Sequence, residues 1–474
     1  MNNRGLIRAA EVKVQSFGLD QLKEAGLIPR DGSYYPAIYY PPIPMYPPTT
    51  PDEVLADFVY DPARPFSVYI HIPFCASRCQ YCHWVVNVGS SEGERDHYLD
   101  SLSIEMDLYQ RMLGVKRPSP RSVLIGGGTP SMLSPRQTER LLSIFSTKFD
   151  LTKCTQMTCE VEPTTVLGEA GLEKLRVMKD FGVDRISLGV QSFKDKALRD
   201  MGRFHSSSDA VEAVDQIRRA GFESLSIDLI YGYPGCTVNE WADTLDTALS
   251  HDIDACQLYR LRIVPHGEKV GAIKSQFDRT PAAFPSPQDI YVMKELGILV
   301  SAGKGLSEVS RRVFAKGPEH NSDYLKDHTD GLADVFGLGI SSWNNLQGRF
   351  FVNMGESLKK YHSLIESGRL PIAKGQVRSA DNEKRWAIAV PLKHHGVSKS
   401  EYRRIAGEEL GASFGRKIEA LKRFGLLHDD ETSLRLTEKG CFLADEVVIQ
   451  FYRTEYLPFP KTAYTDSELN PYFA

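Results

Sequence analysis

The sequence predicts an α/β protein with a partial (β/α)6 barrel, followed by a small α+β domain of winged-helix-like order. Between residues 66 and about 265, short apolar runs alternate with helical stretches, as in strand–helix repeats. After residue 380, helices surround a polar turn at residues 429–432 that is typical of a hairpin. The two patterns together favour a barrel with an appended module.

The expected barrel strands are residues 67–72, 122–125, 157–161, 185–188, 225–230 and 256–260. Ser134 and Ser286 each precede a proline, which is a typical start of a helix. Parallel strands joined by right-handed helical crossovers curve into a barrel. Six units leave the barrel incomplete, and its active site is expected at the carboxyl ends of the strands.

Composition divides the chain into four parts. We expect an N-terminal Tyr/Pro-rich arm (residues 1–65), the barrel (66–300), a segment that closes the substrate cavity (301–375), and the winged-helix-like domain with its tail (376–474). Six prolines in residues 34–48 favour extended chain. The tyrosines of this stretch either pack along the surface or line the mouth of a pocket for a flat aromatic substrate.

The composition is that of a soluble globular protein, with 42% hydrophobic and 25% charged residues. A net charge of −4 gives no reason to expect nucleic acid as a partner, and no apolar run reaches membrane-spanning length. The first residues lack the core of a signal peptide. We therefore expect a cytoplasmic monomer that has no nucleic-acid or membrane partner.

Three cysteines, Cys75, Cys79 and Cys82, follow the first expected strand within eight residues. Three thiolates in one short loop suit a soft metal centre. A structural zinc site would want a fourth Cys or His. Three ligands instead suggest a [4Fe-4S] cluster with one iron left open for a small molecule, because closed clusters use four cysteines.

This spacing, with the flanking Tyr69-x-His71-Ile72-Pro73-Phe74-Cys75, resembles the radical S-adenosylmethionine (SAM) superfamily. Within it, the stretch is similar to one branch: oxygen-independent coproporphyrinogen dehydrogenases, haem chaperones and class C radical SAM methyltransferases. The resemblance implies that Cys75, Cys79 and Cys82 bind a [4Fe-4S] cluster and that SAM binds its open iron. It also implies an electron donor such as flavodoxin or ferredoxin.

Polar and glycine residues at the ends of successive strands match the SAM-contacting positions of that branch. Arginine can pair with a carboxylate, whereas Glu, Gln and Asp can hold an ammonium group or ribose hydroxyls. Glu162 is an alternative to Glu160. The residues that the resemblance assigns to SAM are Tyr69, Gly126, Gly127, Gly128, Thr129, Glu160, Gln191, Arg203 and Asp228.

The residues after the third cysteine depart from two members of the branch. The porphyrinogen-oxidising enzymes carry a further cysteine where this chain has Trp84, and the haem chaperones usually show Asp-Phe where it has His83-Trp84. With the Tyr/Pro-rich arm, this looks most like the class C methyltransferases of natural-product pathways. That resemblance implies two SAM molecules and transfer of a C1 unit to an sp² carbon of an aromatic or heteroaromatic substrate, free or carrier-bound, by methylation or cyclopropanation.

Two other functions stay open for the same motif. One is a coproporphyrinogen III dehydrogenase-like enzyme acting on a tetrapyrrole, and the other is a haem chaperone. An enzyme that removes a substrate proton needs a base, for which a tyrosine, histidine or carboxylate would serve. The sequence does not single out that catalytic residue.

Overall fold

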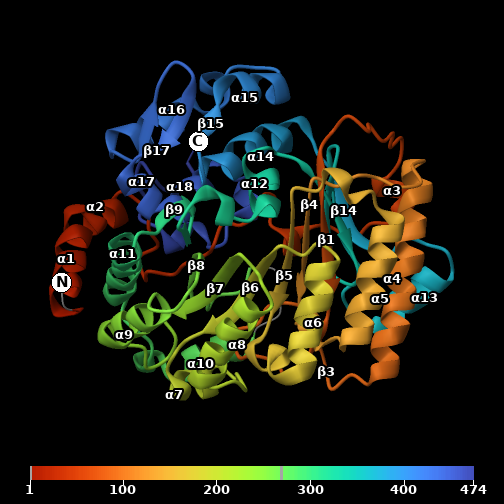
Figure 1. Cartoon of the computed structure of the whole chain (residues 1–474). Helices are drawn as coiled ribbons and strands as arrows, with labels where there is room; N and C mark the ends of the chain where they lie inside the picture. The colour runs from red at the N-terminus through yellow and green to blue at the C-terminus, as the bar shows by residue number, and fades with distance from the viewer. Residues whose placement is uncertain (1–2, 267–270, 474) are drawn as a thin grey trace.

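The computed structural model describes residues 3–266 and 271–473. Within these residues, twelve strands form one sheet that runs through the middle of the molecule (Figure 1). The strands, in their order across the sheet, are β14 (Ile372–Val377), β13 (Arg349–Asn353), β12 (Trp343–Leu346), β11 (Asp334–Leu338), β1 (Phe66–Ile72), β4 (Ser122–Gly127), β5 (Gln156–Val161), β6 (Arg185–Gln191), β7 (Ser224–Tyr231), β8 (Ala255–Arg260), β10 (Val313–Ala315) and β9 (Ser307–Ser310).

The parallel centre of the sheet confirms the predicted α/β barrel class. Strands β1 and β4 to β8 are the six predicted ones, and each pairs in parallel with its neighbour. A further parallel strand, β11, pairs with β1, where Val68 lies opposite Phe336. The carboxyl ends of these strands therefore meet at one end of the barrel.

Residues 301–375, which the sequence predicts to be a connecting segment, contribute strands to the same sheet. β9 and β10 extend it antiparallel beyond β8, and β12, β13 and β14 extend it beyond β11. These strands are only three to six residues long. Runs this short show little alternation, so the sequence pattern does not reveal them.

Helices cover the outer face of the barrel and build the two terminal regions (Figure 1). They are α1 (Asn3–Ser16), α2 (Leu19–Glu24), α3 (Pro51–Val54), α4 (Glu92–Leu113), α5 (Pro135–Lys148), α6 (Gly168–Asp180), α7 (Asp195–Asp200), α8 (Ser207–Arg219), α9 (Val238–Ala248), α10 (Ala272–Arg279), α11 (Pro287–Gly303), α12 (Asp323–Thr329), α13 (Leu358–Glu366), α14 (Ala380–Leu392), α15 (Lys399–Ala406), α16 (Leu410–Arg423), α17 (Glu438–Phe442) and α18 (Ala444–Val448). Single 3-10 turns, among them Pro130–Met132 and Pro163–Val166, connect some of them.

Serine and threonine caps explain why the barrel helices begin where they do. In α5, Gln137 N–H donates to the Ser134 hydroxyl while the Gln137 side chain accepts from Ser134 N–H. Thr237 forms the same reciprocal cap at α9, and Ser286 forms it at α11. Each cap satisfies two backbone donors that a helix start would otherwise leave unpaired.

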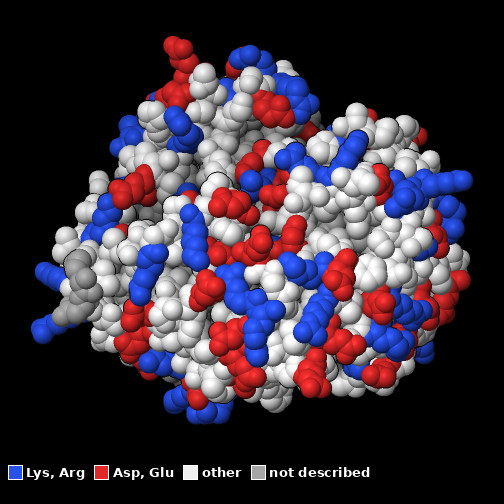
Figure 2. All heavy atoms as spheres, in the orientation of Figure 1, with Lys and Arg blue, Asp and Glu red and all other residues white. Residues whose placement is uncertain are grey.

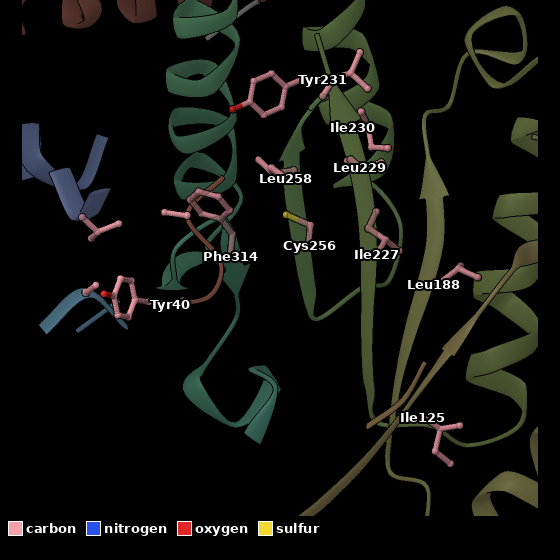
Figure 3. Packing of buried hydrophobic residues seen from close by; sticks show 14 of the residues in the cluster. Tyr40, Ile125, Leu188, Ile227, Leu229, Ile230, Tyr231, Cys256, Leu258 and Phe314 are labelled. Atoms are coloured by element: carbon pink, nitrogen blue, oxygen red, sulfur yellow. The ribbon is translucent and has the colours of Figure 1, made fainter. Parts of the chain in front are cut away.

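The hydrophobic core beside β8 separates an outer face from an inner one. Cys256 and Leu258 point outward toward α11, where a β-carbon on Gly297 would lie 2.7 Å from Leu258 (Figure 3). Because strand side chains alternate, Gln257 and Tyr259 point to the opposite, inner face. Both keep accessible surface in the middle of a strand. These two side chains are therefore less completely buried than Cys256 and Leu258.

The N-terminal arm is held by the C-terminal domain. Tyr40 donates to Asn382 Oδ1 at 2.9 Å, and the Ala37 N–H donates to Asp445 Oδ1 at 2.9 Å. Tyr46 is buried beside Phe350. Tyr40 and Tyr46 therefore have packing roles, and such roles do not indicate a particular function.

The C-terminal module contains a three-stranded sheet of β15 (Val397–Ser398), β17 (Ser433–Leu436) and β16 (Leu427–Asp429). Asp430 stabilises the predicted hairpin, since its carboxylate accepts from the N–H groups of Thr432 and Ser433. Acidic and basic side chains are interspersed over the face shown in Figure 2. Among the helices that the structure describes, none combines the length and the apolar character needed to cross a bilayer.

Candidate functional site

The cysteine loop lies at the carboxyl end of β1. Cys75 ends the short strand β2 (Phe74–Cys75), which pairs in parallel with β3 (Asn87–Val88). Cys79 and Cys82 lie in the loop between these two strands, and the Gln80 N–H donates to the Met201 carbonyl at 3.0 Å. All three thiols are partly buried. Tertiary contacts thus hold the loop against the barrel.

Glycines 126 to 128 let the end of β4 approach this loop. A β-carbon on Gly126 would lie 2.7 Å from the Glu160 carboxylate, and one on Gly127 would lie 2.6 Å from the His71 ring. One on Gly128 would lie 3.0 Å from Cys75 Sγ. The next residue, Thr129, has its hydroxyl 3.4 Å from the same sulfur. Side chains at these glycines would therefore push the thiol loop and Glu160 away.

Arg203 links the cysteine loop to the strand ends. Its guanidinium donates to Cys79 Sγ at 3.5 Å and to the Gly189 carbonyl at 2.8 Å, and it lies 3.5 Å from Glu162 Oε1. Burial opposes its charge, but the neighbouring Tyr81, Cys79 and Glu162 raise the pKa of Arg203. A permanent cation therefore faces the thiol loop.

Glu160 and Asp228 are carboxylates with few partners. Glu160 accepts one bond, from the Gly127 N–H at 3.1 Å, and Asp228 accepts one from the Ser187 hydroxyl at 3.4 Å. Burial, helped by the charge of Asp228, raises the pKa of Glu160 to about 7. Burial also raises the pKa of Asp228 to about 6, against the opposing charge of Arg185. Both groups have free capacity for a cationic ligand.

Glu162, the alternative to Glu160, has a structural set of partners. It accepts from the Thr164 N–H at 2.9 Å and lies 3.0 Å from His205 Nδ1. Burial opposes its ionisation, but the bond from His205 and the charge of Arg203 lower the pKa of Glu162. Its acceptor positions are largely occupied, so we infer that Glu160 has more capacity for a ligand.

Gln191 and Tyr69 lie at different depths of the barrel. Gln191 is the last residue of β6 and has a left-handed backbone with a φ of 67°. The register between β6 and β7 shifts just before it, between Leu188 and Gln191. The Tyr69 hydroxyl lies 3.0 Å from His71 Nδ1.

His71 lies beside the cysteine loop, although the sequence analysis assigned it to neither the cluster nor SAM. Its Nε2 lies 3.1 Å from the Val85 carbonyl, behind the cysteine loop. Burial lowers the pKa of His71 to about 4, so the ring is neutral at pH 7. Its place two residues before Pro73, at the end of an alternating strand, was the available signal. His71 therefore contacts the cysteine loop through Nε2, while Nδ1 contacts Tyr69 of its own strand.

The donor set fits an iron–sulfur cluster. Thiolates are soft ligands, and the adjacent Arg203 offsets negative charge at Cys79. Burial raises the pKa of Cys75 and, to about 11, that of Cys82, so these thiolates need cationic partners. Across the described residues, no three His, Cys, Asp or Glu side chains converge closely enough for a single metal ion. A four-iron cluster does not require that convergence, because each thiolate binds a different iron.

Comparisons with known proteins relate the chain to one superfamily. The family described as "Radical SAM superfamily" matches residues 69–248. The heme chaperone HemW of Bacillus subtilis is 28% identical over 386 residues, which cover 80% of this chain and 97% of that protein. The oxygen-independent coproporphyrinogen III oxidase of Pseudomonas aeruginosa is 26% identical over 411 residues, which cover 83% of this chain and 86% of that protein.

Among solved structures, Escherichia coli coproporphyrinogen III oxidase (HemN), described as a radical SAM enzyme, has the same fold. The TM-score is 0.72 at 24% identity, over 84% of this chain and 92% of that one. Residues 69–248 of the barrel thus match the radical SAM family model, and the fold of the chain is that of a radical SAM enzyme. Over about four fifths of its length, the chain is similar to HemW heme chaperones and to oxygen-independent coproporphyrinogen III oxidases.

The predicted class C methyltransferase function is wrong. Relatives that align with four fifths of the chain are named heme chaperones and coproporphyrinogen III oxidases. Methyl transfer, a natural-product substrate and a second SAM molecule used for it lose their support. The prediction depended on the Tyr/Pro-rich arm and on His83-Trp84. The arm is largely a packing element, and Trp84 is 47% exposed at the surface.

Proposed function

We propose that this protein binds a [4Fe-4S] cluster through Cys75, Cys79 and Cys82, binds SAM beside it, and acts as a haem chaperone. The convergence of the thiol loop with Arg203 at the carboxyl end of the barrel carries the first part. When bound, the cluster and SAM supply one-electron chemistry that protein side chains lack. An electron donor such as flavodoxin or ferredoxin would serve the cluster.

The residues around the thiols each have a task in this proposal. Glu160 and Asp228 bind the cationic groups of SAM, because each has one hydrogen bond from the protein and acceptor capacity to spare. Gln191 adds an amide at the same level of the sheet. Gly126, Gly127 and Gly128 keep the strand end close to the loop.

Two observations favour a haem chaperone over an oxidase. HemW proteins of Bacillus subtilis and Lactococcus lactis align over 97% of their length, against 86% for the Pseudomonas aeruginosa oxidase. Trp84 also stands where the resemblance places a further cysteine in the porphyrinogen-oxidising enzymes. An oxygen-independent coproporphyrinogen oxidase is the second candidate, supported by the oxidases among the relatives.

One anaerobic experiment separates the two functions. The reconstituted protein is given haem in one assay, and coproporphyrinogen III with SAM and a reductant in the other. We expect saturable haem binding by absorbance and no porphyrinogen product above the no-protein control. Multiple turnovers of coproporphyrinogen III with release of carbon dioxide would establish the oxidase instead. Absence of both, in protein with full iron content, would reject the tetrapyrrole proposal.

A further inference from the structure

The cysteine loop packs against two segments that follow it in the chain. The Ser77 hydroxyl donates to the Gly202 carbonyl at 3.2 Å. The Gln80 N–H donates to the Met201 carbonyl at 3.0 Å, and the Gln80 carbonyl accepts from the Ile273 N–H at 3.2 Å. The loop therefore contacts the segment after α7 and the start of α10, and both lie toward the same edge of the molecule as β3 (Figure 1).

Three side chains of the loop and of the segment beside it are exposed to solvent. Phe204 is 71% exposed, and Arg78 and Arg199 are exposed as well. Their backbones meet at Gly202, because a β-carbon on Gly202 would lie 3.5 Å from the Arg78 carbonyl and the Gly202 N–H donates to the Arg199 carbonyl at 3.0 Å. We call Arg78, Arg199 and Phe204 the outer patch.

The acidic side chains next to the outer patch already have partners within the chain. Asp200 pairs with Lys196 at 2.6 Å, and Asp195 accepts from the Ser207 N–H at 2.8 Å. Hydrogen bonds from Ser207 are the main cause of the lowered pKa of Asp195, and Arg199 contributes only through space. Neither patch arginine forms an ion pair or a side-chain hydrogen bond with the described residues. The outer patch therefore presents two unpaired cations beside an exposed ring.

The outer patch lies next to one of the thiols. The Arg203 guanidinium donates to Cys79 Sγ at 3.5 Å, and Phe204 is the next residue along the chain. Cys79 is only partly buried and lies between the exposed residues Arg78 and Gln80. A molecule seated on the outer patch would therefore be separated from Cys79 by one or two residues of protein, and a short path favours transfer of an electron.

We propose that the outer patch is the docking surface for a small, acidic electron-carrier protein of the flavodoxin or ferredoxin kind. The inference rests on the proposed function, because a carrier is needed only if the thiols hold the [4Fe-4S] cluster. One electron leaves the reduced carrier and is taken up at the cluster, so the carrier departs one electron more oxidised.

The chemistry of the outer patch suits such a partner. Exposed, unpaired arginines attract a negatively charged protein and raise the rate of encounter. An aromatic ring supplies an apolar contact of the kind enriched at protein interfaces. Electron-transfer encounters bury little surface and are weak, which fits a patch made of few side chains.

The first measurement is binding of the oxidised carrier, which requires no turnover. The full-length, cluster-loaded protein is titrated with a purified acidic flavodoxin by isothermal titration calorimetry at low ionic strength. We expect the double variant Arg78→Glu, Arg199→Glu to bind about tenfold more weakly or worse, and Phe204→Asp about fivefold more weakly or worse. The effect of the double variant should shrink as salt is added, because salt screens exposed charges.

The second measurement is the rate at which reduced flavodoxin reduces the cluster, followed by stopped-flow absorbance. We expect this rate to fall in the same variants by similar factors. Photoreduced deazariboflavin, a small neutral reductant, should reduce the cluster of every variant equally, and iron content should not change. Slower reduction by both reductants would place the defect in the cluster itself and would overturn the docking role.

Arg111→Glu is the matched control. Arg111 is an exposed arginine in the last turn of α4, and it also forms no ion pair with the described residues. Helix α4 follows β3, and its 22 residues extend about 33 Å, so Arg111 lies far from the cysteine loop. We expect flavodoxin affinity within about twofold of wild type. A loss equal to that of the patch variants would mean that net charge alone governs binding, and would overturn the assignment of this surface.

Two further results distinguish the inference from the function beneath it. If deazariboflavin reduces the cluster of the wild-type protein but flavodoxin neither binds nor reduces it, the docking inference fails while the cluster assignment stands. If anaerobically reconstituted protein holds no cluster, the proposed function fails and takes the inference with it. Flavodoxin binding to cluster-loaded protein that depends on the outer patch and not on Arg111 supports both.

Discussion

Asp445 and Glu160 are both carboxylates inside the protein, but only Asp445 is neutralised by the chain itself. Asp445 accepts from Lys393, from the Ala37 N–H and from the Tyr34 hydroxyl, and the Lys393 and Arg312 charges lower its pKa despite burial. Glu160 accepts one hydrogen bond, and its pKa is raised to about 7. Asp445 therefore joins the arm to the C-terminal domain, whereas Glu160 is left with capacity for a ligand.

Replacing a cluster ligand should give the largest effect, because the proposed cluster is lost and SAM is proposed to bind beside that cluster. We expect Cys79→Ala to lose the [4Fe-4S] cluster and SAM binding in anaerobically reconstituted protein. Iron analysis and EPR of the reduced protein measure this. Cys154→Ala is the control, since Cys154 lies before β5 and donates to the Gln156 carbonyl. A normal cluster in Cys79→Ala would contradict the assignment.

Removing the paired carboxylate, Asp445, should lower the stability of the folded protein. Asp445→Ala leaves the buried Lys393 without its counter-ion, so we expect the free energy of unfolding to fall by about 3–5 kcal/mol. Denaturant titration by circular dichroism measures the change. Glu11→Gln, which removes the exposed partner of Arg8, should cost about 0–1 kcal/mol. Equal effects of the two substitutions would mean that burial does not decide the role of the Asp445 pair.

Substitutions at the residues proposed to contact SAM should change the affinity for SAM and leave folding unchanged. We expect Asp228→Ala and Gln191→Ala each to weaken SAM binding about 10- to 100-fold, which corresponds to one charge-assisted hydrogen bond. Iron content should stay at the wild-type level, because neither residue is a thiol ligand. Equilibrium dialysis with SAM and iron analysis test both statements. A variant that loses its cluster instead would show that the residue is structural.

The smallest effect concerns pH. A free pKa of about 7 for Glu160 means that the carboxylate is mostly ionised at pH 8 and mostly protonated at pH 6. If the anion binds SAM, affinity should rise about tenfold from pH 6 to pH 8 in wild type and less in Glu160→Gln.

The stability of the SAM-free protein should change in the opposite direction. A carboxyl group whose folded pKa is raised binds its proton more tightly in the folded state, so its contribution to stability falls as pH rises from about 4.5 to 7. Glu160→Gln should therefore stabilise the SAM-free protein above pH 7, whereas Asp445→Asn should destabilise it. A stabilised Asp445→Asn variant would contradict the claim that the charge of Asp445, unlike that of Glu160, stabilises the fold.

Much of the fold was predictable because its signals are local. The six central strands appear as apolar runs, and Ser134, Thr237 and Ser286 carry caps that act within four residues. The hairpin at residues 429–432 is likewise stabilised by Asp430 within its own turn. The strands between residues 307 and 377 were not predicted, because each is only three to six residues long and their attachment to the barrel depends on β10 pairing with β8 and β11 pairing with β1.

The prediction of function failed at the arm. A Tyr/Pro-rich stretch favours extended chain, but sequence does not state what the tyrosines contact. The structure places Tyr40 on Asn382 and Tyr46 beside Phe350, both far away in the chain. Tyr39 likewise packs against Trp343, with the two rings tilted and their centroids 4.6 Å apart. The methyltransferase prediction therefore depended in part on residues that pack the arm against the rest of the protein.

By itself, the sequence determined the α/β class, the strand order of the central barrel and the loop with three cysteines, because periodicity, caps and spacing act over a few residues. Only the tertiary structure decided which buried charges are paired. Lys393 neutralises Asp445 across 52 residues of chain, and no similar partner reaches Glu160 or Asp228 among the described residues. Whether a buried charge is structural or open to a ligand depends on distances between distant segments, and these exist only after folding.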